Sequence, residues 1–496
     1  MWQLGKHLFG ALLWAVAGLA GVAPPQGNPA RVVFSLSLEP AGLDPTIAPA
    51  ASIGEVVHYN VFEGLVKIEE SGATTPLLAS SWHIEPDGLS YRFALRKDVR
   101  FHDGAAFDAA AVRFSFERAM APGSTNKSKK ALFDNIAGIE TPDSHTLVLR
   151  LHHADANFLF RLGEGPAVVL HPASAARAAT APVGTGPYVF QGRKPGHSIT
   201  LRKFDGYRRA REVHIPEVLF RFINQPQAQT EAMQAREVDV FFNIATQAVA
   251  HFQADSAYQV LIGASSGKGM LALNNRRKPL DDVRVRRAIA HAIDRERFIQ
   301  EVLDGRGKAI GSHFSPTDPG YVHLAGLYPY DPQRAQALMQ EAGVALPLKL
   351  GLTLPPTPYA RAGAPLIVAA LARIGIEVTP QEGDWAHWMA GPFKGDFDMT
   401  LINHVEPLDY QIYADPGYYF GYDNPAFRAL VERHAASSSA RERQLLFAQI
   451  QRTLAGDAVN AWIFAPQIST VARKGLKGLW MNYPVFVHDL AALRWE

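Results

Sequence analysis

The chain of 496 residues contains no cysteine, and this absence excludes several kinds of site. Disulfide bonds, thiolate metal ligands and cysteine nucleophiles all need a thiol, so none of them can occur here. A bacterial lipoprotein anchor also needs a cysteine at the new N-terminus, so we expect the exported form to carry no lipid anchor. Any binding or catalysis must therefore use carboxylates, imidazoles, hydroxyls, amides and aromatic rings.

The chain also has little net charge. Its 49 basic residues nearly balance its 47 acidic residues, which leaves a net charge of +2. This balance gives no general attraction to nucleic acid or to an anionic membrane, so we expect no nucleic-acid partner. With 47% hydrophobic and 19% charged residues the composition is typical of a folded soluble protein, and the length predicts two or three domains.

Long apolar runs are scarce, and the one that stands out lies at the N-terminus. Lys6 and His7 precede an apolar stretch from Leu8 to Ala23 that ends in small residues. This is the pattern of a secretory signal peptide, which we assign to residues 1–23, because the stretch is short for a membrane span and no stop-transfer charges follow it. A retained anchor is the alternative. We expect a cleaved, unlipidated protein in the periplasm.

The most informative segment for function runs from Lys394 to Tyr422. It begins as a short apolar run bounded by Gly395, which predicts a buried strand. The apolar run then stops at polar, acidic and aromatic residues interrupted by Pro407. A strand that ends in such an irregular loop is how a rigid sheet presents ligand-contacting side chains. A surface loop with core tyrosines is the alternative interpretation.

Turn and capping signals predict alternating helices and strands in the rest of the chain. We expect a strand at 32–36, a hairpin around the turn at 86–88, and a helix that begins after Asp108. Pro332 and Gly343 bound another helix, and strands near 348–352 and 376–378 flank a helix near 360–373, which predicts an α/β lobe. Helices near 425–435 and 440–454 and a strand at 462–464 follow.

Two segments resemble functional motifs only weakly. Residues 263–269 look like a phosphate-binding loop, but three residues instead of four separate the outer glycines, and neither Ser nor Thr follows the lysine. His152, His153 and Asp155 suggest a metal site, but neighbouring residues of a strand point to opposite faces. We therefore expect no nucleotide, no metal and no cofactor.

Several motifs in the same order resemble the solute-binding proteins of peptide-type ABC importers, the extracellular solute-binding family 5. The residues that carry the resemblance are Leu43-Asp44-Pro45, Phe62-Glu63-Gly64-Leu65, Tyr91-Arg92-Phe93, Val99 to Gly104, Gly184 to Tyr188 and Val283 to Ile289. The resemblance extends over essentially the whole mature chain. It implies an α/β fold of the two-lobed periplasmic-binding-protein type (class II) with an additional domain inserted in the first lobe.

The resemblance also implies a domain organisation and a function. Lobe one would comprise 24–55, 181–270 and 479–496, the additional domain 56–180, and lobe two 271–478. Closure of the lobes would bury a peptide-like or related polar solute, and a monomer would deliver it to the membrane permease subunits of an ABC importer. No enzymatic activity is implied. A secreted hydrolase and a chaperone-like binder are alternatives, although no H-E-x-x-H motif occurs.

The ligand site implied by the resemblance departs from the family pattern at one position. In the family's peptide binders an aspartate at the position of Asn403 pairs with the α-ammonium of the ligand, and a neutral amide cannot compensate that charge. Either another acid substitutes or the ligand is not a free-amine peptide. The candidate ligand-binding residues are Glu39, Trp385, Trp388, Asn403, His404, Glu406, Asp409, Tyr410 and Tyr413. His404 does not match the metal-binding histidine of the nickel binders by position.

Overall fold

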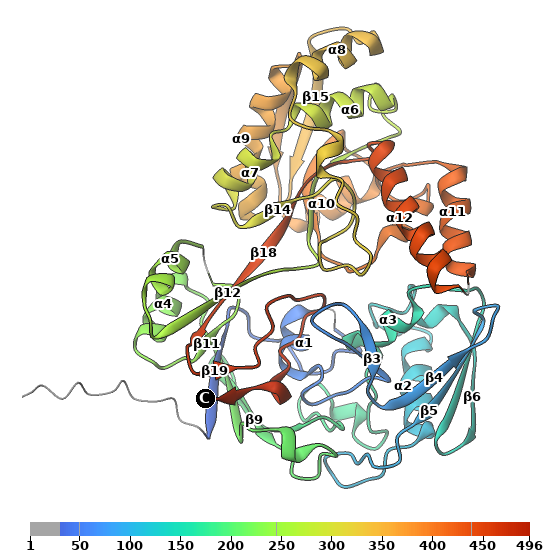
Figure 1. Ribbon diagram of the computed structural model, residues 1–496, viewed down its shortest axis with the longest axis vertical. Coiled ribbons are helices and arrows are strands. Elements are labelled where there is room, and N and C mark those ends of the chain that lie inside the picture. Colours follow the sequence, from blue (N-terminus) through green and yellow to red (C-terminus); the bar gives the residue numbers. More distant parts are fainter. Residues whose placement is uncertain (1–29, 49, 245, 438) are drawn as a thin grey trace, which may run out of the picture.

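The computed structural model describes residues 30–496 except 49, 245 and 438, so the predicted signal peptide lies outside the described residues. The chain forms two lobes connected by a long strand, with a third domain beside the first lobe (Figure 1). None of the helices in the described part is long and apolar enough to cross a membrane.

One mixed sheet of twelve strands continues through both lobes. The strands in lobe one are β1 (Arg31–Leu36), β8 (Tyr188–Lys194), β9 (Ser198–Lys203), β10 (Glu217–Phe222), β11 (Val240–Phe241) and β12 (Tyr258–Ala264). Those in lobe two are β13 (Lys268–Leu273), β14 (Gly307–Ala309), β15 (Leu348–Leu354), β16 (Ile376–Glu382) and β17 (Met399–His404). The predicted strand at 32–36 is therefore confirmed as β1.

The twelfth strand, β18 (Ala461–Arg473), joins the lobes. Its first half pairs with β13 and β14, and its second half, from Gln467 onward, pairs with β11 and β12. Pro466 lies where the partners change, which suits a residue that has no N–H to donate to a ladder. The chain crosses between the lobes a second time at 264–268, so the Gly-rich segment that resembles a phosphate loop is part of an interlobe connection.

The helices of lobe two cover both sides of its half of the sheet. They are α6 (Val283–Ala292), α7 (Arg295–Val302), α8 (Pro332–Ala342), α9 (Pro358–Ala372), α10 (Trp385–Ala390), α11 (Pro425–Ala436) and α12 (Ala440–Gly456). The predicted boundaries of α8 are confirmed: Asp331 caps its first turn, and Gly343 ends it with a positive φ of 68° that glycine adopts without steric cost. Apolar residues of α6, α8 and α9 form one core with those of β13, β15 and β17.

The additional domain has its own sheet and core. Strands β4 (Ala79–Ile84), β5 (Ser90–Leu95), β7 (Thr146–Leu151) and β6 (Ile136–Asp143) lie in that order, accompanied by the short strands β2 (Val66–Ile68) and β3 (Thr74–Pro76). Helix α2 (Ala109–Met120) begins where predicted, because the Asp108 carboxylate accepts from the Ala111 N–H at 3.0 Å. Helix α3 (Phe158–Leu162) is short, and Asn157 just before it donates to the Leu408 carbonyl of lobe two at 3.3 Å.

Lobe one is completed by helices α1 (Ala51–Val57), α4 (Pro226–Gln234) and α5 (Thr246–Ala254), and by the C-terminal strands β19 (Leu476–Lys477) and β20 (Arg494–Trp495). Two motifs of the sequence meet at its junction with the additional domain. Glu63 accepts two hydrogen bonds from Arg208, both at 2.8 Å, and a third from the Thr185 hydroxyl at 2.9 Å. The second half of β18 pairs with strands of lobe one, although it falls within residues 271–478, the range predicted for lobe two. The domain boundaries themselves stay a prediction.

Candidate ligand-binding cleft

A cavity of about 370 Å³ lies where lobe one, the additional domain and lobe two meet. One wall comes from lobe one and another from residues between 127 and 166 of the additional domain, and the loop after β17 in lobe two closes the cavity. The lobe-one residues are Pro45, Ala48, Ala50, Ala51, Gly54, Val485 and Phe486, and the lobe-two residues are Glu406, Pro407 and Asp409. This volume falls within the range of small-molecule sites, roughly 300–1,000 Å³. A ligand in it would contact both lobes at once.

The walls of the cavity carry charges of both signs. Lys127 is exposed, while Arg161 donates to Asp155 at 2.7 Å and also to Gln411. Glu164 makes no hydrogen bond to another described side chain, and burial raises the pKa of its carboxyl group despite the nearby positive charges. The cavity is therefore suited to a polar solute with hydrogen-bonding or charged groups at more than one end.

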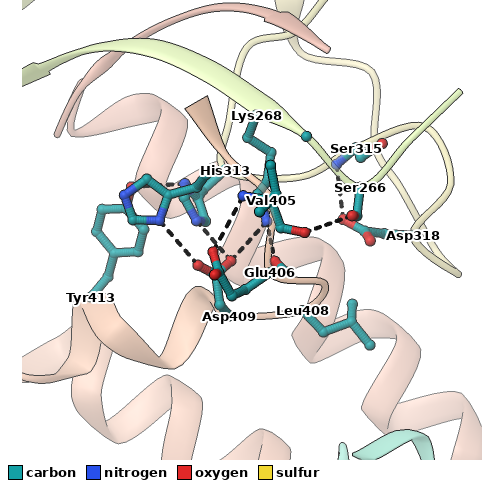
Figure 2. Close-up of polar contacts among 12 residues, drawn as sticks. Ser266, Lys268, His313, Ser315, Asp318, Val405, Glu406, Leu408, Asp409 and Tyr413 are labelled. Atoms are coloured by element: carbon teal, nitrogen blue, oxygen red, sulfur yellow. Dashed lines mark hydrogen bonds and ion pairs between the residues drawn. The ribbon is translucent and has the colours of Figure 1, made fainter. Parts of the chain in front are cut away.

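The loop that closes the cavity follows β17 and turns sharply. Leu408 has a positive φ of 52°, which is uncommon for a residue with a side chain. The turn places the Asp409 carboxylate back against β13 and β17 instead of letting the chain continue outward, as Figure 2 shows. The acidic loop residue therefore faces the interior of lobe two as well as the cavity.

Asp409 is held by three side chains from three different segments (Figure 2). Its Oδ1 accepts from Lys268 Nζ and from His313 Nε2, both at 2.8 Å, and its Oδ2 lies 3.3 Å from His404 Nδ1. Burial would raise the pKa of Asp409, but the charges and hydrogen bonds of these neighbours hold it well below its usual value. Asp409 is thus a carboxylate with its charge already compensated.

Tyrosines orient the two imidazoles. Tyr413 Oη lies 3.0 Å from His313 Nδ1, and Tyr419 Oη lies 2.7 Å from His404 Nε2. Because a carboxylate only accepts, each ring donates to Asp409 through the nitrogen that faces it. Burial lowers the pKa of His313 to about 4, so its ring is neutral at pH 7. The permanent positive charge beside Asp409 is therefore the ammonium of Lys268.

The same cluster is bonded to the interlobe connection. Ser266 donates to the Val405 carbonyl at 2.6 Å, and Lys268 also donates to the Glu406 carbonyl. A buried carboxyl group lies next to them: Asp318 accepts from the Ser315 N–H at 2.8 Å, and burial raises its pKa to about 6 (Figure 2). Hydrogen bonds therefore join the cavity loop directly to the connection between the lobes.

The structure brings four of the nine candidate residues together. Glu406 and Asp409 line the cavity, and His404 and Tyr413 support Asp409 from behind. The remaining five lie elsewhere and do not line this cavity: Glu39, Trp385, Trp388, Asn403 and Tyr410.

Each of these five has its own surroundings. Glu39 forms an ion pair with Arg193, Trp385 is 47% exposed, and Trp388 is buried with its Nε1 donating to Thr400 at 3.0 Å. Tyr410 is buried beside His434. Asn403 Oδ1 is buried without a hydrogen-bond partner among the described residues. A ligand-binding role for any of the nine residues stays a prediction.

Lys268 and His313 were not identified as site residues from the sequence. They lie 141 and 96 residues before Asp409, and neither belongs to a motif with it. The pairing of β13 with β17 places Lys268 directly opposite His404, and only this register brings the ammonium to the loop. Lys268 belongs to the segment 263–269 that weakly resembles a phosphate-binding loop. No residue near it in the sequence predicts its contact with Asp409.

Comparison with known proteins agrees with this architecture. Residues 73–423 match the model of the "Bacterial extracellular solute-binding proteins, family 5 Middle". Di/tripeptide-binding protein 1 of Pseudomonas aeruginosa is 28% identical over 426 residues, 79% of each chain, and Heme-binding protein A of Haemophilus influenzae is 27% identical over 462 residues, 84% of each chain.

Solved structures are similar over nearly the whole chain. DppA from Helicobacter pylori in complex with the peptide STSA has a TM-score of 0.78 at 25% identity and covers 94% of this chain and 98% of its own. HbpA2 from Haemophilus parasuis has a TM-score of 0.86 and covers 94% and 100%; at 21% identity it shows the fold alone. The family match and the two-lobed fold together show that this chain belongs to the bacterial extracellular solute-binding proteins, family 5.

Proposed function

We propose that this chain is the periplasmic binding component of a peptide-type ABC importer and captures a peptide-like or related polar solute in the interlobe cavity. The observation that carries the proposal is a cavity whose walls come from both lobes, next to the two crossings of the chain between those lobes. A solute in such a cavity stabilises the closed arrangement through contacts that the open arrangement lacks. Relatives named as di/tripeptide-binding proteins support a peptide-like solute.

Delivery to the membrane follows from the same arrangement. A closed form that differs in shape from the empty form allows permease subunits to distinguish loaded from unloaded protein. We further propose that the mature protein is an unlipidated monomer released from its signal peptide. N-terminal sequencing and light scattering of protein recovered from the periplasm test both points; a retained Met1 or a stable dimer would contradict them.

The function is tested by titrating the purified mature protein with a panel of dipeptides and following heat, melting temperature and small-angle scattering. A cognate solute at 100 times its Kd stabilises the native state by about 2.7 kcal/mol and reduces the radius of gyration. Native mass spectrometry of freshly purified protein identifies any solute that copurifies. Mass spectrometry of the titrated solute distinguishes binding from hydrolysis, because a binding protein returns the solute unchanged.

A variant of the cavity and a matched control locate the site. Glu406→Gln removes a charge from the cavity wall, whereas Glu301→Gln removes one from the exposed surface of α7, where Glu301 pairs with Arg297. The first should change the affinity for a charged solute severalfold or more, and the second should not. Equal effects of the two substitutions, or saturation with no change in scattering, would argue against binding in this cavity.

A further inference from the structure

The side chains around Asp409 bear on which solutes the cavity accepts, an inference that rests on the proposed function. We propose that Lys268 is a specificity-determining residue whose ammonium takes, beside the Asp409 carboxylate, the place that the ammonium of a free-amine ligand would take. The cavity then selects peptide-like solutes whose group at Asp409 is an amide, a hydroxyl or an acylated nitrogen. Free-amine peptides lose the charge pairing that such a carboxylate would otherwise offer.

The hydrogen-bonding capacity of Asp409 facing the protein is already in use. A carboxylate oxygen has two lone-pair sites, and Oδ1 accepts from both Lys268 Nζ and His313 Nε2 at 2.8 Å. Oδ2 faces His404 Nδ1 at 3.3 Å. A ligand ammonium arriving from the cavity would find one remaining acceptor site, on Oδ2. The charge of that carboxylate is already compensated by Lys268.

The charge of the cluster leads to the same conclusion. The Lys268 side chain is 1% exposed, and the His313 side chain is fully buried. A second ammonium in contact with Asp409 would lie close to that of Lys268, and like charges in a poorly solvated site repel strongly. The compensation that a free amine needs must therefore come from elsewhere in the cavity, whose other two acids, Glu164 and Glu406, share its walls with Lys127 and Arg161.

The position beside Asp409 is built for a cation. Ligand atoms of His313, His404 and Asp409 lie within 4.8 Å of one another, an arrangement that would also suit a metal ion. The protein places the Lys268 ammonium there instead, and that ammonium donates in addition to the Glu406 carbonyl. Since an unpaired buried ammonium is costly, Lys268 stays on Asp409 whether or not a ligand is present.

The experiment compares alanyl-phenylalanine with its N-acetyl form by calorimetry on three proteins. Wild type should bind the free-amine form no more tightly than the acetylated form. Lys268→Ala exposes Asp409 to the ligand ammonium, so the ratio of the two affinities should shift toward the free amine by about 10- to 100-fold, as expected for one charge-assisted hydrogen bond. The third protein, Lys349→Ala, loses an exposed positive charge on β15 outside the cavity and should shift the ratio by less than about threefold.

A second measurement needs no peptide. Removal of the Lys268 side chain leaves space for a small cation, so ethylammonium chloride should raise the melting temperature of Lys268→Ala above its value in the same concentration of sodium chloride, and wild type should show no such difference. If Lys268→Ala does not fold, Lys268→Met, which retains most of the volume, is used for the affinity ratio.

The outcomes separate the two proposals. Peptide binding with an unchanged affinity ratio in Lys268→Ala overturns the role of Lys268 and leaves the proposed function intact. Absence of binding by every peptide, together with rescue by ethylammonium, overturns the peptide-like function and supports the cation position at Asp409. Absence of both binding and rescue overturns both.

Discussion

Replacing Asp409 by asparagine tests how strongly the cavity loop depends on the buried ion pair. The substitution keeps the size and shape of the side chain but removes the negative charge that faces Lys268 at 2.8 Å. The Lys268 side chain is 1% exposed, so water cannot replace the lost carboxylate without opening the structure. Asp409→Asn therefore leaves an ammonium buried with only an amide and a backbone carbonyl as acceptors.

The expected cost follows from the burial of the pair. Breaking a buried ion pair on one side typically destabilises a protein by about 3–5 kcal/mol, because an uncompensated charge remains. A cooperative unit of 150–250 residues, about the size of lobe two, loses roughly 2–4 °C in melting temperature per kcal/mol. We expect Asp409→Asn to lower the melting temperature of ligand-free protein by roughly 6–20 °C.

A double-mutant cycle isolates the interaction. Lys268→Met alone leaves the carboxylate unpaired and should also destabilise, whereas Lys268→Met combined with Asp409→Asn removes both charges and should recover about 2–3 kcal/mol relative to the sum of the single variants. Glu301→Gln breaks the exposed pair with Arg297 and serves as the control, with an expected cost below about 1 kcal/mol. Differential scanning calorimetry measures wild type and all four variants.

The reasoning fails if the single variants are no less stable than the Glu301→Gln control. It also fails if the effects of Lys268→Met and Asp409→Asn simply add, since additivity would mean that the two groups do not interact in the folded protein.

Three further outcomes are expected. Burial lowers the pKa of His488 to about 3, so below about pH 6.5 the unfolded chain binds a proton at this residue and the folded protein does not. The free energy of unfolding should therefore fall by about 2–3 kcal/mol between pH 6.5 and 4.5. The melting temperature of His488→Phe should depend less on pH than that of wild type, and equal pH slopes would argue against this. Glu63→Gln breaks the buried pair with Arg208 and should cost about 3–5 kcal/mol in calorimetry, whereas a loss below 1 kcal/mol would contradict the importance of this junction. Because Asn403 does not line the cavity whereas Glu406 and Asp409 do, Asn403→Asp should change the affinity for a free-amine dipeptide by less than about threefold in titration calorimetry, and a tightening of roughly 10- to 100-fold would show that this strand end contacts the amine.

Patterns of neighbouring residues were sufficient to predict the local elements and the family. Asp108 and Asp331 act as helix caps, and Gly343 ends a helix, because capping depends on a few neighbouring residues whose chemistry is readable in order. The segment after β17 was likewise identified as a strand leading into a polar loop, and Glu406 and Asp409 of that loop do line the cavity.

Some local predictions were incomplete for reasons that lie outside the local pattern. The strand expected at 462–464 extends to Arg473, because its second half finds partners in β11 and β12 of the other lobe. The sequence predicts Trp388 as a ligand-contacting aromatic residue. In the structure α10 directs its ring into the core, against Thr400 and Tyr419. Neither pairing across lobes nor the direction of one helix is encoded in neighbouring residues.

The chemistry of the candidate site depends on contacts between segments that lie far apart in the chain. The sequence is compatible with an unpaired Asp409 carboxylate that is available to a ligand. In the structure its charge is compensated by Lys268, 141 residues earlier in the chain. That contact depends on the register of β13 against β17 and on the turn at Leu408, both of which are set by the packing of the whole lobe. Residue types establish which charges are present, whereas the non-local strand pairing establishes which of them remain available to a solute.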